Sequence, residues 1–223
     1  MAEPTGPGRL RALVVDWGGV LTDPLATAIA AWAEVDGVPM DDYVAVMRGW
    51  FGSEQGQLAR DNPVAALERG EIAVPHFEDQ LAARLSEQSG HQVEPRGLVL
   101  RMFAAFAHAP AMSSLVLRAR GAGLRTGLLS NSWGDEHYTR DGWDEMFDAV
   151  VISGEVGMRK PEPEIFELTL DLLGVRAEET VFVDDLLPNV EAARDLGLVA
   201  VHHTSYDETS VELERLFGLP LRS

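Results

Sequence analysis

The chain has 223 residues, of which 46% are hydrophobic and none is cysteine, and its formal net charge is −18. This length suits one domain, or a core domain with a large insertion. The acidic balance argues against binding to nucleic acids or anionic membranes. The lack of cysteine excludes disulfides and thiolate sites, and no hydrophobic run approaches the ~20 residues of a membrane span. We expect a cytoplasmic monomer or homodimer.

Residues 1–9 are rich in Pro and Gly and lack the hydrophobic core of a signal peptide, so we expect a flexible tail there. Beyond them, short runs that are apolar on both faces alternate with helical patterns. The expected strands are Leu10–Asp16, Leu124–Ser130, Ala149–Ser153, Thr180–Asp184 and Val199–His202. The expected helices between and after them are Ala111–Ala122, Pro163–Leu173, Pro188–Leu196 and one that begins with a capping box at Thr209–Glu212. This alternation predicts a doubly wound, Rossmann-like α/β core with a parallel sheet.

The long stretch after the first strand breaks this rhythm, because it contains helical patterns and no convincing strand. These patterns are Leu25–Val35, Asp41–Trp50, Pro63–Arg69, Val74–Ser86 and Pro95–Ala107. We therefore predict a core domain made of residues 10–22 and 108–223, with an all-helical cap domain inserted at 23–107. Such a cap would lie over the carboxyl edge of the sheet, where ligands bind in folds of this type.

Several chemically active side chains stand where the predicted strands end. They are Asp16, Ser130, Asn131, Lys160, Asp184, Asp185 and Asn189. Taken singly, each has an ordinary structural explanation: a turn at Ser130, a solvated surface position for Lys160, a helix cap at Asp184. Together they would meet at one edge of a parallel sheet. Adjacent carboxylates at the end of an apolar strand are costly without a nearby cation, which favours a metal site.

Four segments carry a resemblance to a known family. They are Asp16-Trp-Gly-Gly-Val20, Leu128-Leu-Ser130-Asn131, Arg159-Lys160-Pro-Glu-Pro and Phe182-Val-Asp184-Asp185-Leu-Leu-Pro-Asn189. In this order and spacing they resemble the motifs of the haloacid dehalogenase (HAD) superfamily. The third and fourth look most like those of the phosphatase domain at the N-terminus of mammalian soluble epoxide hydrolases, and of its bacterial relatives.

The resemblance implies a phosphatase that acts on a small phosphorylated substrate, and it implies a role for each matching residue. Asp16 would attack phosphorus and form an aspartyl-phosphate, with Ser130 and Lys160 as the other catalytic residues. Ser130, Asn131 and Lys160 would bind the phosphoryl group. Mg²⁺ would be held by Asp16, the backbone carbonyl of Gly18 and Asp185. Asp184 and Asn189 would orient these ligands.

Gly18 departs from the family pattern, in which most phosphatases carry an Asp that protonates the leaving group. Such acid–base help is worth roughly 10²–10⁴ in rate. Asp23 and Glu54 are possible substitutes, although neither has a persuasive spacing. Three alternatives to the phosphatase remain open: a sluggish or non-catalytic protein that binds a phosphorylated ligand, which Gly18 supports, a 2-haloacid dehalogenase, and a phosphomutase. The retained Asp184-Asp185 pair argues against the dehalogenase, and Gly18 itself argues against the mutase.

Overall fold

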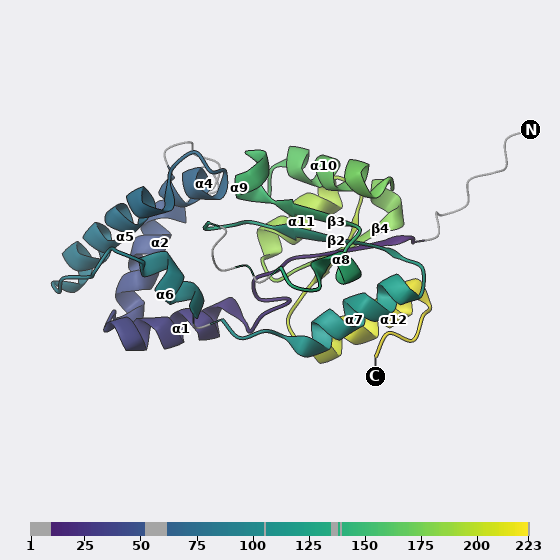
Figure 1. Cartoon of the computed structure of the whole chain (residues 1–223), viewed down its shortest axis with the longest axis horizontal. Coiled ribbons are helices and arrows are strands. Elements are labelled where there is room, and N and C mark those ends of the chain that lie inside the picture. The colour runs from purple at the N-terminus through teal and green to yellow at the C-terminus, as the bar shows by residue number, and fades with distance from the viewer. Residues whose placement is uncertain (1–9, 52–61, 105, 135–137, 139, 223) are drawn as a thin grey trace, which may run out of the picture.

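A parallel five-stranded sheet forms the core of the protein, as the computed structural model shows for residues 10–51, 62–104, 106–134, 138 and 140–222 (Figure 1). The strands are β1 (Ala12–Val15), β2 (Arg125–Ser130), β3 (Ala149–Ile152), β4 (Thr180–Asp184) and β5 (Val199–His202). Their order across the sheet is β3-β2-β1-β4-β5, and every neighbouring pair is parallel. The predicted α/β class and all five predicted strands are confirmed. The predicted tail, residues 1–9, and Glu54 lie outside the described residues.

Helices cover both faces of this sheet. α10 (Pro163–Leu173) and α11 (Leu187–Asp195) pack on one face, and α7 (Pro110–Gly121) and α12 (Tyr206–Phe217) pack on the other (Figure 1). Short helical turns complete the core domain: α8 (Trp143–Met146), α9 (Ser153–Val156) and η1 (Ala177–Glu179).

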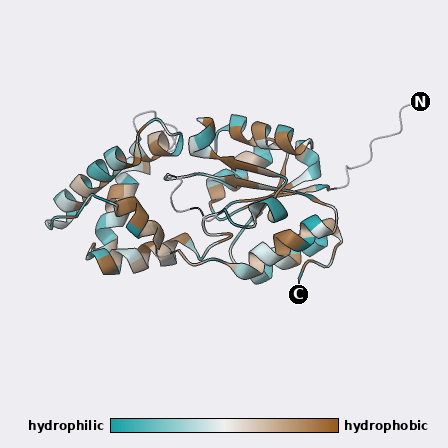
Figure 2. Cartoon of the chain, viewed as in Figure 1, coloured by the Kyte–Doolittle hydropathy of each residue, from teal (hydrophilic) through white to brown (hydrophobic). Residues whose placement is uncertain are grey.

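Strand β1 shows why its sequence reads as apolar throughout. Leu13 packs in the hydrophobic cluster under α7, whereas the next residue, Val14, packs in the cluster under α10. Successive side chains of a strand point to opposite faces, so a strand covered on both sides needs hydrophobic residues at every position. Figure 2 shows the strands mainly in the colour of hydrophobic residues.

Two of the predicted helices differ from the observed ones. The capping box at Thr209–Glu212 is wrong, because α12 begins earlier and its N-cap is Ser205, whose hydroxyl accepts a hydrogen bond from the Glu208 N–H at 3.3 Å. Ser205 and Glu208 have the same spacing as the predicted pair, and Ser205 caps the helix through its hydroxyl, whereas the Glu208 carboxylate accepts from the Thr204 hydroxyl. The helix predicted at Pro95–Ala107 is also shorter, since α6 spans Leu98–Ala104 and Gly97 before it has a φ of 69°.

The inserted helices form a second layer beside the carboxyl edge of the sheet (Figure 1). They are α1 (Leu25–Asp36), α2 (Met40–Phe51), α4 (Pro63–Glu68), α5 (Val74–Ser89) and α6. They share a hydrophobic cluster of their own, with Trp32 and Phe77 fully buried in it. The two chain segments that lead to and from these helices are joined by an isolated antiparallel bridge between Thr22 and His108. Among the described residues, no helix is long and apolar enough to cross a membrane.

Candidate active site

The two central strands bring the first and fourth motifs together. β1 and β4 are neighbours, with Val15 paired to Val183, so Asp16 and Asp184 stand side by side where these strands end. The chain runs outward from β1 through β2 to β3 and then returns to β4 on the other side of β1. This reversal makes the β1–β4 boundary the topological switch point, where parallel α/β sheets form their ligand crevice.

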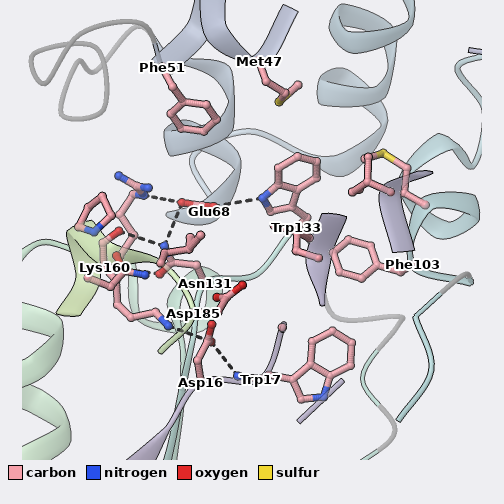
Figure 3. Close-up of a pocket in the computed structure, with 18 of the residues that line it drawn as sticks. Asp16, Trp17, Met47, Phe51, Glu68, Phe103, Asn131, Trp133, Lys160 and Asp185 are labelled. Carbon is pink, nitrogen blue, oxygen red and sulfur yellow. Dashed lines mark hydrogen bonds and ion pairs between the residues drawn. The ribbon is translucent and has the colours of Figure 1, made fainter. Parts of the chain in front are cut away.

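Lys160 joins the two carboxylates at this point. Its Nζ lies 2.8 Å from Oδ1 of Asp16 and 2.6 Å from Oδ2 of Asp184, and its side chain is only 1% exposed (Figure 3). Asp184 also accepts hydrogen bonds from Nδ2 of Asn189 at 3.0 Å and from the backbone N–H of Leu186 at 2.8 Å. Asp184 therefore holds Lys160 and the turn before α11, but it is not a helix cap, because the N-cap of α11 is Leu186 and no side chain caps this helix.

Asp185 turns back toward the first loop. Its carboxylate lies against Gly19, where an added Cβ atom would be 2.3 Å from Oδ2 of Asp185. Nε2 of the His202 ring lies 3.0 Å from the backbone carbonyl oxygen of Asp185. A side chain at position 19 is therefore incompatible with this arrangement, which explains the second glycine of the Gly18-Gly19 turn.

The site carries an excess of buried negative charge. Burial raises the pKa of Asp16 to about 8, because the Lys160 ammonium only partly compensates and the carboxylates of Asp184 and Asp185 add to the rise. Burial and Asp184 likewise raise the pKa of Asp185 to about 6. Burial by itself would lower the pKa of Lys160, but Asp16 and Asp184 raise it to about 12, so this residue stays positively charged.

These carboxylates are suitable ligands for a cation. Asp16, Asp184 and Asp185 each offer an oxygen atom, and the three atoms lie within 4.8 Å of one another. Clustered carboxylate oxygens are the donors that hard divalent cations prefer. A bound cation would supply the positive charge that Lys160 alone does not provide, so the residues present fit a metal centre.

The second and third loops are locked together through Asn131. Its Nδ2 donates to the backbone carbonyl of Lys160 at 3.0 Å, and its Oδ1 accepts from the backbone N–H of Lys160 at 2.8 Å. Ser130 is buried, does not line the cavity described below, and its hydroxyl lies 2.8 Å from that of Tyr138. The amide of Asn131 thus fixes the position of the lysine backbone, and Tyr138 holds the serine hydroxyl.

A cavity of about 480 Å³ separates this polar floor from the inserted helices. Figure 3 shows Asp16, Lys160 and Asp185 at one end of it, and Phe51 and Met47 of α2 at the other. The walls are mainly apolar or aromatic, and they consist of Trp17, Leu25, Ile29, Tyr43, Met47, Phe51, Met102, Phe103, Phe106 and Trp133. The cavity suits a ligand with a charged head and a hydrophobic body.

Glu68 is the acidic residue that α4 brings to this cavity, and it belongs to none of the four sequence motifs. Its carboxylate accepts hydrogen bonds from Nδ2 of Asn131, Nε1 of Trp133 and Nε of Arg159. Trp133 follows the second motif closely and Arg159 precedes Lys160, so both were visible as neighbours of motif residues. Nothing in the spacing pointed to Glu68. Asp23, suggested above as a substitute acid, does not line the cavity.

The fold and site together define a hydrolase-type α/β protein with an aspartate at the switch point and an inserted helical layer above it. The chain matches the family of haloacid dehalogenase-like hydrolases over residues 10–197, and it belongs to that family.

Individual relatives agree with this assignment. The chain is 30% identical to the bifunctional epoxide hydrolase 2 of Sus scrofa over 95% of its own length and 40% of that protein. It is 39% identical to the sesquiterpene phosphatase astK of Aspergillus oryzae over 48% of its own length and 56% of that protein. The chain thus spans less than half of the first of these relatives.

A solved structure shares the fold. A HAD family enzyme of Bacteroides thetaiotaomicron matches with a TM-score of 0.67 and 20% identity, over 92% of this chain and 99% of that one. The same enzyme has been crystallised with magnesium and inorganic phosphate.

Proposed function

We propose that this protein is a Mg²⁺-dependent phosphatase that hydrolyses a phosphate monoester through an aspartyl-phosphate at Asp16. The observation that carries the proposal is the position of the Asp16 carboxylate, next to Lys160 and Asp185 on the polar floor of the cavity. Family membership and the phosphatase among the relatives support the same chemistry. We further propose that residues 10–22 and 108–223 act as the core and residues 23–107 as a cap that encloses the substrate.

The main obstacle for such a reaction is electrostatic, because a carboxylate must approach a phosphate dianion. Each pair of like charges costs about 4 kcal/mol at ~4 Å with an effective dielectric constant of ~20. Mg²⁺, held by Asp16, the Gly18 carbonyl and Asp185, would offset part of this cost. Lys160 adds a permanent positive charge, which Asp184 and Asn189 keep in place.

The residues of the site carry out the reaction in two steps. An Asp16 oxygen forms a bond to phosphorus as the bond from phosphorus to the ester oxygen breaks, and water later hydrolyses the aspartyl-phosphate. In this scheme the backbone N–H of Asn131 binds a phosphoryl oxygen. The Ser130 hydroxyl, which lies 2.8 Å from that of Tyr138 and does not line the cavity, has to turn toward the substrate to bind the same oxygen. Position 18 offers no acid, so the leaving oxygen takes its proton from water. Esters with stable leaving groups, such as aryl, acyl or anomeric sugar phosphates, should therefore react faster than alkyl phosphates.

The shape and lining of the cavity favour one class of phosphate ester, those with an apolar body. Its apolar walls would bury a hydrophobic or aromatic group attached to the phosphate, and burial contributes about 25 cal/mol per Å² of apolar surface. The partial similarity to a sesquiterpene phosphatase points in the same direction. We therefore place small esters with an apolar body ahead of highly polar sugar phosphates.

The direct test is phosphate release from para-nitrophenyl phosphate and from a panel of apolar, sugar and nucleotide monoesters. Release should require Mg²⁺ and should be lost in Asp16→Asn. If no ester in the panel is hydrolysed but inorganic phosphate still binds, the protein is a binding module, the alternative that Gly18 favours. Halide release from 2-chloropropionate without added metal would instead identify a dehalogenase.

A further inference from the structure

We propose that Glu68 is a positioning residue, which ties the inserted helices to the loops that would bind phosphate and thereby fixes the geometry of Asn131 and Lys160. This inference rests on the proposed function, because it assigns a residue to that same site. It starts from the location of Glu68 at the end of α4, far in sequence from every motif residue that it contacts.

The carboxylate of Glu68 gathers donors from two loops. Oε2 accepts a hydrogen bond from Asn131 at 3.2 Å and one from Nε of Arg159, and Oε1 accepts one from Nε1 of Trp133 at 3.1 Å (Figure 3). Asn131 and Trp133 follow β2, whereas Arg159 directly precedes Lys160. One side chain from the helical layer therefore holds two of the loops on which the proposed reaction depends.

Asn131 carries this constraint to Lys160. The same amide nitrogen that donates to Glu68 also donates to the Lys160 carbonyl, and the amide oxygen accepts from the Lys160 N–H. The Lys160 side chain then reaches Asp16 at 2.8 Å. A continuous set of hydrogen bonds thus connects a helix of the insertion to the nucleophile.

The contacts of Glu68 are buried, so their loss should cost more free energy than the loss of exposed contacts. Glu68 and Arg159 are both buried and oppositely charged. Loss of one partner from a buried ion pair leaves the other charge uncompensated, which is far more disruptive than loss of an exposed pair. The loops should therefore adopt their productive arrangement only when Glu68 is seated among its donors.

The neighbouring residue provides a matched comparison. Arg69 also joins α4 to the core, because its Nε donates to Glu162 at 2.8 Å, but it contacts neither Asn131 nor Trp133 and does not line the cavity. Gly70, the next residue, also packs closely against the core, because an added Cβ there would lie 2.8 Å from the carbonyl oxygen of Gly154. Arg69→Gln therefore weakens the contact of α4 with Glu162 of the third loop, whose carboxylate also accepts from the Arg159 N–H at 3.1 Å. It leaves in place the hydrogen bonds that Glu68 receives from Asn131 and Trp133.

The experiment compares wild type, Glu68→Gln and Arg69→Gln with Mg²⁺ and para-nitrophenyl phosphate. Glu68→Gln should lower kcat about ten- to hundredfold, the loss expected when reacting groups are misplaced by roughly 1 Å, with KM changed much less. Arg69→Gln should leave kcat within about twofold. Equal losses in the two variants would mean that α4 only fastens the insertion to the core, and would overturn the proposal. An unchanged kcat in Glu68→Gln would do the same.

A second measurement does not depend on turnover. In ¹⁵N-labelled protein, Glu68→Gln should shift the indole N–H signal of Trp133 and the side-chain amide signals of Asn131, and Arg69→Gln should leave them in place. Unmoved Asn131 signals would overturn the coupling, whereas absent turnover in wild type would reject only the phosphatase function. If Glu68→Gln does not fold, Glu68→Gln/Arg159→Gln removes both buried charges, and the same signals and kcat are read from that variant.

Discussion

Nζ of Lys160 lies 2.8 Å from Oδ1 of Asp16, so the proposed nucleophile and the buried cation form one electrostatic unit. The same ammonium lies 2.6 Å from Asp184. Lys160 therefore has a structural role as well as its proposed catalytic one, because it neutralises carboxylates that the fold forces together at the switch point. Mutations of Lys160 should therefore change the free energy of unfolding even when no substrate is present.

Lys160→Met keeps the length of the side chain and removes its charge, which leaves the carboxylates of Asp16 and Asp184 buried without their partner. We expect a loss of about 3–5 kcal/mol in the free energy of unfolding, as when one member of a buried ion pair is removed. Urea denaturation of the metal-free protein measures this loss. Arg215→Gln, which breaks an exposed pair with Glu212, is the control and should be indistinguishable from wild type. Equal stabilities of the two variants would refute the structural role of Lys160.

Much of this site was visible in the sequence because its parts obey local rules. Strands that are apolar on both faces identify a covered parallel sheet, and residues that follow such strands must meet at one edge. Asp16, Lys160 and Asp184 could therefore be placed together before the structure was known, and the structure joins them through hydrogen bonds.

The remaining contacts could not be found in this way because they depend on how the insertion packs. Glu68 and Arg159 are 91 residues apart, and neither belongs to a pattern that requires the other. The Tyr138 hydroxyl lies 2.8 Å from that of Ser130, although no local pattern in the sequence links the two residues. Local rules of periodicity and capping do not predict which side chains meet in such pairs.

Gly18 and Gly19 should respond differently to the same small substitution. An added Cβ at Gly19, whose φ is 73°, would lie 2.3 Å from Asp185, whereas nothing lies within 4 Å of one at Gly18. Gly19→Ala should therefore displace Asp185 and lower both the melting temperature and Mg²⁺ affinity, with a stability loss of about 1–3 kcal/mol. Gly18→Ala should preserve both. Calorimetry of the two variants checks this, and similar behaviour would show that Asp185 does not depend on Gly19.

Mg²⁺ binding should strengthen as pH rises from 6 to 8. The pKa of Asp16 is raised to about 8 and that of Asp185 to about 6, so at pH 6 the metal-free site holds protons that a cation must displace. As pH increases these groups lose their protons, and Kd should fall by up to about tenfold per pH unit for each proton displaced. Titration calorimetry at several pH values measures this. A pH-independent Kd would contradict the raised pKa values, and Asp16→Asn should bind Mg²⁺ more weakly, with a smaller dependence on pH above 7.

Gly18→Asp should supply the acid that the site lacks. The backbone accepts a side chain here, because the φ of Gly18 is not in the left-handed region and open space surrounds the Cβ position. Protonation of the leaving group matters most for poor leaving groups, so kcat/KM for alkyl phosphates should rise by roughly 10²-fold or more. For para-nitrophenyl phosphate, whose leaving group is stable as an anion, the change should be small.

Gly18→Asn separates proton transfer from the other effects of a longer side chain at this position. The amide of Asn has nearly the shape of the Asp carboxyl group and cannot donate a proton to the leaving oxygen. The ratio of alkyl to aryl phosphate turnover should therefore rise in Gly18→Asp and stay at the wild-type value in Gly18→Asn. A similar rise in both variants would point to improved positioning. No rise in either would show that another group already protonates the leaving oxygen, or that a step other than ester cleavage limits turnover.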